Sequence, residues 1–203
     1  MKKLSLILAL LFAFALCSCQ KQEQQPTEQA PTVTEEETPQ KQEKMPPVEE
    51  SLRGTILNGK FYLVDGYAAI SAFEGWTIKM VYEYSTKLVS PKSKDTLTIG
   101  IIHDPDGRDK FEDNTEELKK EAFKNAFSET NFISFEKSEE NGIKKVSSVC
   151  KVTEDEVSYT VYEYKLFINT DIYTLSYYVY GEELTETEVK TNVASFEYLG
   201  QIK

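Results

Sequence analysis

The sequence predicts an α+β fold for residues 51–203, an αβα sandwich with a central, mainly antiparallel sheet. Three observations predict it. Stretches of alternating apolar and polar residues recur, separated by turns such as Asn58-Gly59 and Asn141-Gly142. Consecutive strands joined by such short turns pair in antiparallel fashion. Residues 114–127 and 184–198 instead space apolar residues three to four positions apart, as amphipathic helices do.

The first part of this domain is predicted to be all strand. Asn58-Gly59 predicts a two-residue hairpin between residues 56–57 and 61–64, because both turn positions require a positive φ. Alternation predicts three further strands, over residues 67–73, 76–84 and 96–102. The strand pattern stops at Asp104-Pro105-Asp106-Gly107, which has the composition of a turn.

A helix is predicted next, with Asn114 as its N-cap and Glu116 and Glu117 complementing its dipole. Its apolar stripe would consist of Leu118, Ala122, Phe123, Ala126 and Phe127. The strand pattern then returns over residues 132–135, 143–152, 157–167 and 172–180, before a second helix from about Leu184 to Tyr198.

Two motifs carry a family resemblance. The first is Ile70-Ser71-Ala72-Phe73-Glu74-Gly75-Trp76, and the second is Asn192-Val193-Ala194-Ser195-Phe196. They resemble the PsbP-like family, which includes photosystem II extrinsic proteins, a eukaryotic nuclear-import factor and many bacterial lipoproteins. Glu74 stands where that family usually has proline. The resemblance implies a binding or assembly role without catalysis, and a cystatin-like or NTF2-like sheet is the alternative fold.

The N-terminus predicts a lipoprotein signal over residues 1–18. Lys2 and Lys3 precede an apolar run too short for a bilayer crossing, which takes about 20 residues, but typical of a secretory signal. The run ends in Leu16-Cys17-Ser18-Cys19, which resembles the lipobox of bacterial lipoproteins. The small Ser18 favours cleavage before Cys19 over Cys17, and in that family the new N-terminal cysteine carries palmitate-type acyl chains. An ordinary secretory signal is the alternative.

The resemblance implies a lipid anchor in the bacterial cell envelope. Gln20 replaces the aspartate that retains lipoproteins in the inner membrane of enteric bacteria, which favours the outer membrane where one exists. Residues 19–50 combine the acylated cysteine with a stretch rich in Gln, Pro and Glu. Such a stretch buries too little apolar area to offset the entropy of ordering, so we expect a disordered tether.

Composition and charge exclude several classes of function. The chain carries 34 acidic and 23 basic residues, a net charge of −11, which argues against nucleic acid and against electrostatic binding to anionic lipid. The densest group of potential metal ligands is the loop of residues 103–113. Asp104, Asp106 and Asp109 are the weak candidates for a cation site. Their spacing departs from an EF-hand and Arg108 lies among them, so we expect a solvated loop.

No catalytic residue and no cofactor is assigned. Cys150 alternates with valines, as a buried small residue does, and nothing in the sequence places His103, the only histidine, beside it. Tyrosines form three groups, with Tyr82 and Tyr84 in the first and Tyr162 and Tyr164 in the second. The third group is Tyr177, Tyr178 and Tyr180. An exposed row would suit a protein or glycan partner, but we expect half to enter the core and the others to cover the sheet beneath a helix.

Three hypotheses follow for function. The first is a non-enzymatic envelope lipoprotein that binds or assembles with an unknown partner. The second is a carrier of a small ligand or a cation, using the loop of residues 103–113 or a cleft between sheet and helix. The third, an envelope hydrolase with paired carboxylates, requires a deep cleft that holds a close carboxylate pair.

Overall fold

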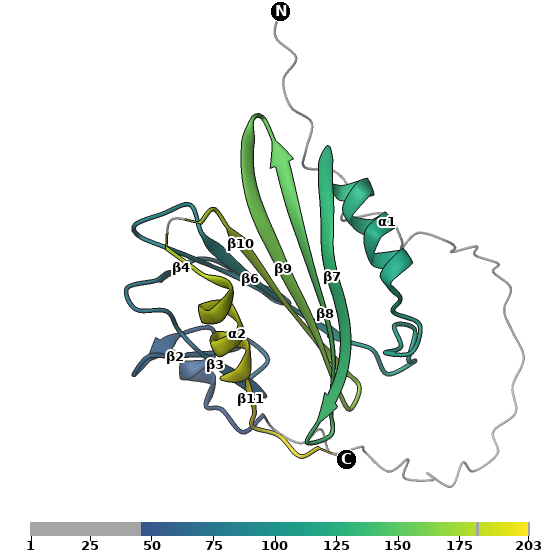
Figure 1. Ribbon diagram of the computed structural model, residues 1–203. Coiled ribbons are helices and arrows are strands. Elements are labelled where there is room, and N and C mark those ends of the chain that lie inside the picture. The colour runs from purple at the N-terminus through teal and green to yellow at the C-terminus, as the bar shows by residue number, and fades with distance from the viewer. Residues whose placement is uncertain (1–45, 182, 203) are drawn as a thin grey trace, which may run out of the picture. The chain divides into compact units, whose positions relative to one another are not determined.

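The computed structural model describes residues 46–181 and 183–202, so the predicted signal, Cys19 and most of the predicted tether lie outside the described residues. The described part contains two antiparallel sheets and two α-helices (Figure 1). Neither helix is long and apolar enough to span a membrane, a finding that concerns the described residues alone.

The larger sheet has seven strands in the order β4-β5-β6-β10-β9-β8-β7, and every neighbouring pair is antiparallel. Its strands are β4 (Thr77–Tyr82), β5 (Ser85–Val89), β6 (Thr96–His103), β7 (Glu129–Glu140), β8 (Ile143–Glu154), β9 (Val157–Ile168) and β10 (Asp171–Val179). The β7–β8 turn places Asn141 and Gly142 at φ 53° and 77°, as the sequence predicts for a tight hairpin.

The smaller sheet has the order β1-β2-β3-β11. Its strands are β1 (Ile56–Leu57), β2 (Lys60–Tyr62), β3 (Ala68–Ser71) and β11 (Glu197–Tyr198), and a short 3-10 helix, η1 (Glu50–Leu52), precedes them. Asn58 and Gly59 have φ values of 51° and 73°, which confirms the predicted first hairpin. Val48, in the predicted tether, is buried and its N–H bonds to the Gly66 carbonyl, so this stretch packs on the domain.

Two apolar clusters lie on opposite faces of the larger sheet. Val161 belongs to the cluster beneath α1 (Glu116–Ala126), and Tyr162, the next residue of β9, belongs to the other cluster. Successive side chains of a strand point to opposite faces. The second face is covered by α2 (Glu186–Ala194) together with the smaller sheet. The predicted αβα sandwich is therefore confirmed only in part, because a second sheet shares one of the outer layers.

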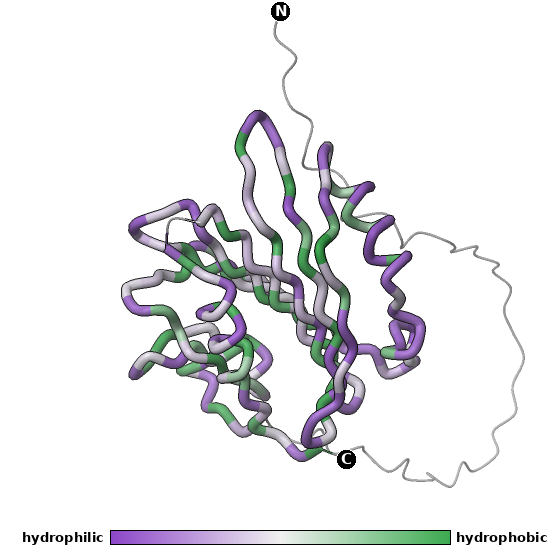
Figure 2. Tube along the Cα trace, in the orientation of Figure 1, coloured by the Kyte–Doolittle hydropathy of each residue, from purple (hydrophilic) through white to green (hydrophobic). Residues whose placement is uncertain are grey.

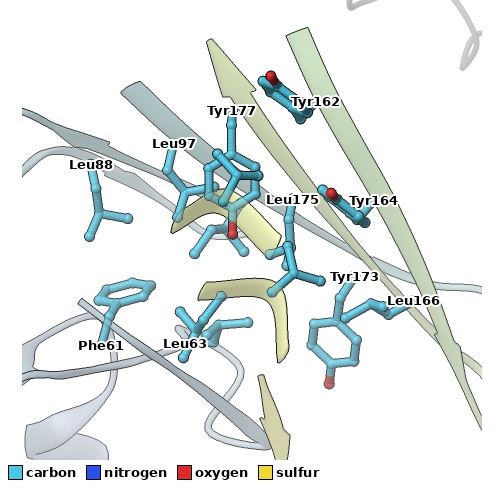
Figure 3. Packing of buried hydrophobic residues seen from close by; sticks show 14 of the residues in the cluster. Phe61, Leu63, Leu88, Leu97, Tyr162, Tyr164, Leu166, Tyr173, Leu175 and Tyr177 are labelled. Atoms are coloured by element: carbon cyan, nitrogen blue, oxygen red, sulfur yellow. The ribbon is translucent and has the colours of Figure 1, made fainter. Parts of the chain in front are cut away.

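Tyrosines of β10 fill the core between these layers. Tyr173 and Tyr177 are fully buried and extend toward Phe61 and Leu63 (Figure 3). The Tyr177 hydroxyl donates to Asn192 Oδ1 at 2.7 Å, and Asn192 Nδ2 donates to the Ser71 carbonyl at 2.6 Å. The two motifs that resemble the PsbP-like family thus join α2 to β3 and to the core.

The helices begin and end differently from the prediction. Thr115, not Asn114, caps α1, because its hydroxyl accepts the Leu118 N–H. Leu118 is 56% exposed and Phe123 is the one buried residue of α1, so the predicted apolar stripe packs only at its centre. Hydrophilic residues accordingly dominate α1 (Figure 2). The second predicted helix is shorter than expected, since the chain after Ala194 continues into β11.

The strand β5 was not predicted. The chain reverses between β4 and β5 at Glu83-Tyr84, a turn without glycine, proline or asparagine, so composition gives no signal there. All the strands that were predicted are present, and β7 extends beyond the predicted residues 132–135 in both directions.

Candidate functional site

A groove of about 550 Å³ lies at one end of the larger sheet, where it meets the smaller one. Six segments form it: the stretch before η1, the β2–β3 loop, the β4–β5 turn, the end of β6, the β9–β10 turn, and β11 with the residues after it. Its lining includes three tyrosines and three carboxylates, Tyr67, Tyr84, Tyr198, Asp65, Glu83 and Asp171. The segment after β11 runs past this end of the sheet toward the C-terminus (Figure 1).

Asp65 is a half-buried carboxylate of the groove. Its Oδ1 accepts the Tyr67 N–H at 3.0 Å and its Oδ2 accepts the Tyr173 hydroxyl at 2.7 Å. Burial raises the pKa of Asp65, and these two hydrogen bonds only partly offset that effect. Gly66 has a φ of 74°, and a Cβ there would lie 2.7 Å from Arg53 Nε, so only glycine fits this turn.

Tyr198 and Tyr67 form an aromatic wall. Their rings stack with centroids 6.4 Å apart and planes at 18°, and the Tyr173 ring meets Tyr198 edge-on. The strand pairing of Tyr198 with Ala68 positions this wall, and the Leu199 N–H bonds to the Tyr67 carbonyl at 2.7 Å. A Cβ on Gly200 would lie 2.7 Å from Tyr198 Cε1, so the ring occupies space that a side chain would need.

The rim is formed by the β4–β5 turn and by the end of β6. The Tyr84 hydroxyl donates to Glu83 Oε1 at 2.6 Å, and the Tyr84 side chain is 60% exposed. The Glu83 carboxylate raises the pKa of Tyr84. On the opposite side, His103 Nδ1 lies 2.7 Å from Asp171 Oδ1, and the histidine side chain is 65% exposed.

Negative charge dominates the groove. Among the described residues that line it, none is lysine or arginine, and His103 is the one basic side chain. The negative charge also affects the pKa of the neighbouring Tyr198. Burial is the main cause of the raised pKa of Tyr198, and the carboxylates of Asp171 and Asp65 add to it. A cation would be favoured at this position.

The predicted weak cation ligands lie in the adjoining loop and are already engaged. Asp104 Oδ2 accepts the Asp109 N–H at 2.8 Å, Asp106 pairs with Arg108 at 2.8 Å, and Asp109 pairs with Lys165 at 2.6 Å. Across residues 46–181 and 183–202, no three His, Cys, Asp or Glu side chains are grouped so as to hold a metal ion. Most of the loop is exposed, and two of its acids, Asp109 and Glu112, pair with the sheet lysines Lys165 and Lys144.

Cys150 lies away from His103. It is fully buried in the cluster with Phe123 and Val152 beneath α1, whereas His103 lines the groove. Burial raises the pKa of the Cys150 thiol. Cys150 therefore packs as the small buried residue that the alternation predicts.

The tyrosine groups divide much as expected. Tyr162, Tyr164 and Tyr177 are buried in the core. Tyr178 and Tyr180 pack against Tyr159 on the face that carries α1, with centroids 6.2 and 4.9 Å from its ring. The expectation is thus confirmed for these two groups, but it is wrong for Tyr82 and Tyr84, which are both 60% exposed.

Most residues of the groove were not predicted from the sequence. Asp65, Glu83, Asp171, Tyr67 and Tyr198 stand at or beside turns that are far apart in the chain. Only the strand order and register bring these turns together, and no local pattern encodes either. Among the six lining tyrosines and carboxylates, Tyr84 alone was singled out, as one of two tyrosines on the same strand.

No protein-family model matches the chain. No curated protein sequence matches it either.

Solved structures do resemble it. Cyanobacterial PsbP (CyanoP) from Synechocystis sp. PCC 6803 superposes with a TM-score of 0.59 at 12% identity, over 68% of this chain and 91% of that one. A protein from Bacteroides thetaiotaomicron gives 0.52 at 15% identity, over 72% of this chain and 50% of that one. The Ran-binding protein Mog1p from Saccharomyces cerevisiae gives 0.49 at 10% identity, over 71% and 97%, and we base no argument on it. At these identities the likeness concerns the fold alone: the described domain has a PsbP-like fold.

Proposed function

We propose that this chain is a lipid-anchored binding module of the cell envelope, in which Cys19 carries the anchor and the groove is the recognition site. The groove is the observation that carries this proposal. Its volume of about 550 Å³ lies within the usual range of ligand sites, and it combines aromatic walls with a few converging polar groups. The order of residues Leu16 to Gln20 supports an outer-membrane location where the cell has one.

Binding is favoured over catalysis by the state of the groove carboxylates. Both oxygens of Asp65 accept hydrogen bonds, from the Tyr67 N–H and the Tyr173 hydroxyl, which hold the side chain as an acceptor. An acid catalyst would instead need to present its proton to a substrate. Asp171 is likewise engaged, by His103. A hydrolase therefore remains the weaker hypothesis.

The anchor is tested at the two cysteines of the signal. Cys19→Ser should prevent acylation and release the protein from membranes, whereas Cys17→Ser should leave it attached, since Cys17 leaves with the signal. Mass spectrometry of the processed protein should find an acylated N-terminal residue at position 19. An unmodified thiol there, or release by Cys17→Ser alone, would contradict the proposal.

The recognition site is tested by photo-crosslinking in intact cells. A benzophenone amino acid replaces Tyr84 in one variant and Tyr82 in the other. The two tyrosines are equally exposed, at 60%, but only Tyr84 lines the groove. We expect a defined adduct from position 84 and none from position 82. Equal labelling, or no adduct at position 84, would contradict a role for the groove.

The size of that adduct separates the two binding functions. An adduct with a second protein or a glycan supports the assembly role. A mass increase of a few hundred daltons supports the small-ligand carrier, which the volume of the groove also favours.

A further inference from the structure

We infer that the groove recognises an organic ammonium ion. This inference rests on the proposed function of the groove as a binding site and names the chemistry of its ligand. Charge and aromatic side chains support it independently, and the described residues offer no group of three His, Cys, Asp or Glu side chains that could hold a metal ion.

The charge of the groove is only partly compensated, because His103, which pairs with Asp171 at 2.7 Å, is its one basic side chain among the described residues. Asp65, Glu83 and Asp171 approach it from three different segments, and none of the described residues that line it is lysine or arginine. By contrast, carboxylates just outside it pair with lysines, as Glu112 does with Lys144 at 2.8 Å. An excess of negative over positive side chains in a partly enclosed site favours binding of a positive ligand.

The walls of the groove suit a cation that carries carbon substituents. Tyr67, Tyr84 and Tyr198 line it, and the faces of tyrosine rings attract ammonium groups through their quadrupoles. Alkyl groups on the nitrogen would pack against the same rings. A bare metal ion would instead require several oxygen ligands, and the described residues offer no group of three that could hold one.

Other ligand chemistries fit less well. An anion would meet three carboxylates. A neutral sugar would gain from the tyrosine rings, but it would leave the charge of the groove without a counterion. Asn169, one of the two side-chain amides of the lining, already donates to the Gln201 carbonyl at 2.9 Å.

The test uses choline and its neutral carbon isostere, 3,3-dimethylbutan-1-ol (dimethylbutanol below), which have nearly the same shape and differ in charge. The processed, full-length protein is kept in a non-ionic detergent without sugar groups, and broadening of the ligand methyl resonance in NMR reports binding. Micelles without protein supply the background. We expect saturable binding of choline in the millimolar range or tighter, and none of dimethylbutanol. Ethanolamine in a parallel titration shows whether a primary ammonium is accepted as well.

Matched variants locate the binding. Tyr84→Ala should weaken choline binding about 3- to 30-fold, the range that a cation–π contact supplies. Tyr82→Ala removes an equally exposed tyrosine outside the groove and should leave the affinity unchanged. Both side chains are largely exposed, so neither variant threatens folding.

Each other result overturns the inference. Equal binding of dimethylbutanol would show that the charge of the ligand does not matter. An affinity for choline that Tyr84→Ala leaves unchanged would show that choline binds outside the groove. Failure of both choline and ethanolamine to bind would remove the ammonium ligand. Binding of N-acetylglucosamine in their place would do the same. The proposed function is judged separately, because the crosslinks from position 84 depend on no assumption about the ligand.

Discussion

Two acidic regions adjoin at the β9–β10 turn, and they use their carboxylates in opposite ways. In the loop of residues 104–113, Asp109 pairs with Lys165 and Glu112 pairs with Lys144. In the groove, Glu83 bonds to the Tyr84 hydroxyl, and none of the described lining residues is lysine or arginine. A high density of acidic residues in a sequence therefore does not by itself mark a binding site. The position of the basic residues decides between packing and recognition.

The loop owes its position to these pairs and to aromatic packing. Lys165 lies on the face of β9 that α1 partly covers, and Phe111 packs edge-on against Phe167 at 5.9 Å. Lys137 and Lys144 lie over the Phe111 ring, at 4.6 and 5.3 Å from its centroid. Each acid of the loop that faces the sheet therefore stabilises the fold and is withdrawn from ligand binding.

The largest effect on stability is expected in the loop. Asp109→Ala leaves Lys165 without its partner, and because the Lys165 side chain is only 17% exposed, we expect a loss of about 1–2 kcal/mol. Asp106→Ala is the control: its pair with Arg108 is exposed on both sides, so stability should not change measurably. Urea unfolding measures both. Equal losses of stability in the two variants, or no loss in Asp109→Ala, would show that the Asp109–Lys165 pair does not stabilise the fold.

A smaller effect is expected at Gly200. A methyl group there overlaps the Tyr198 ring and must displace it, at a cost of about 1 kcal/mol, because the ring is only partly enclosed. The displacement should also weaken ligand binding, since Tyr198 forms part of the aromatic wall. Gly100→Ala controls for the loss of a glycine elsewhere, because Gly100, like Gly200, has no positive φ, and a Cβ there would meet only Thr174 Cβ at 3.9 Å. Unchanged binding by Gly200→Ala would remove Tyr198 from the site.

Asp65 should give a pH-dependent effect. Burial raises its pKa above the ordinary value of 3.8. As the pH rises above 3.8, the unfolded chain releases this proton before the folded chain does. The wild type should therefore lose stability relative to Asp65→Asn until the raised pKa is passed, and the difference should then level off. Urea unfolding over a pH series measures it, with Asp113→Asn, at an exposed site, as the control. A slope of opposite sign would contradict the assignment.

Much of the fold was predictable because its signals are local. Asn58-Gly59 and Asn141-Gly142 adopt the positive φ values from which the hairpins were predicted. Two features were missed for physical reasons. The turn at Glu83-Tyr84 contains no residue typical of turns, and β11 is too short to show alternation and depends on pairing with β3.

The groove could not be predicted, because it is a property of register. Asp65 and Tyr198 meet through Tyr173, whose hydroxyl bonds to the first and whose ring packs on the second. All three residues are ordinary in their local sequence. The dense acidic loop, in contrast, attracted attention because its residues are adjacent in the chain, and its lysine partners come from distant strands.

Whether the groove, and not the adjoining loop, binds a positive ligand is tested most directly by comparing two glutamates, one from each region. Glu83→Gln and Glu112→Gln remove the same charge from exposed side chains, and choline binding is measured for both by ligand NMR with the processed protein. We expect Glu83→Gln to weaken binding severalfold without loss of stability, and Glu112→Gln to leave binding unchanged. Equal weakening by both variants, or weakening by Glu112→Gln alone, would contradict it.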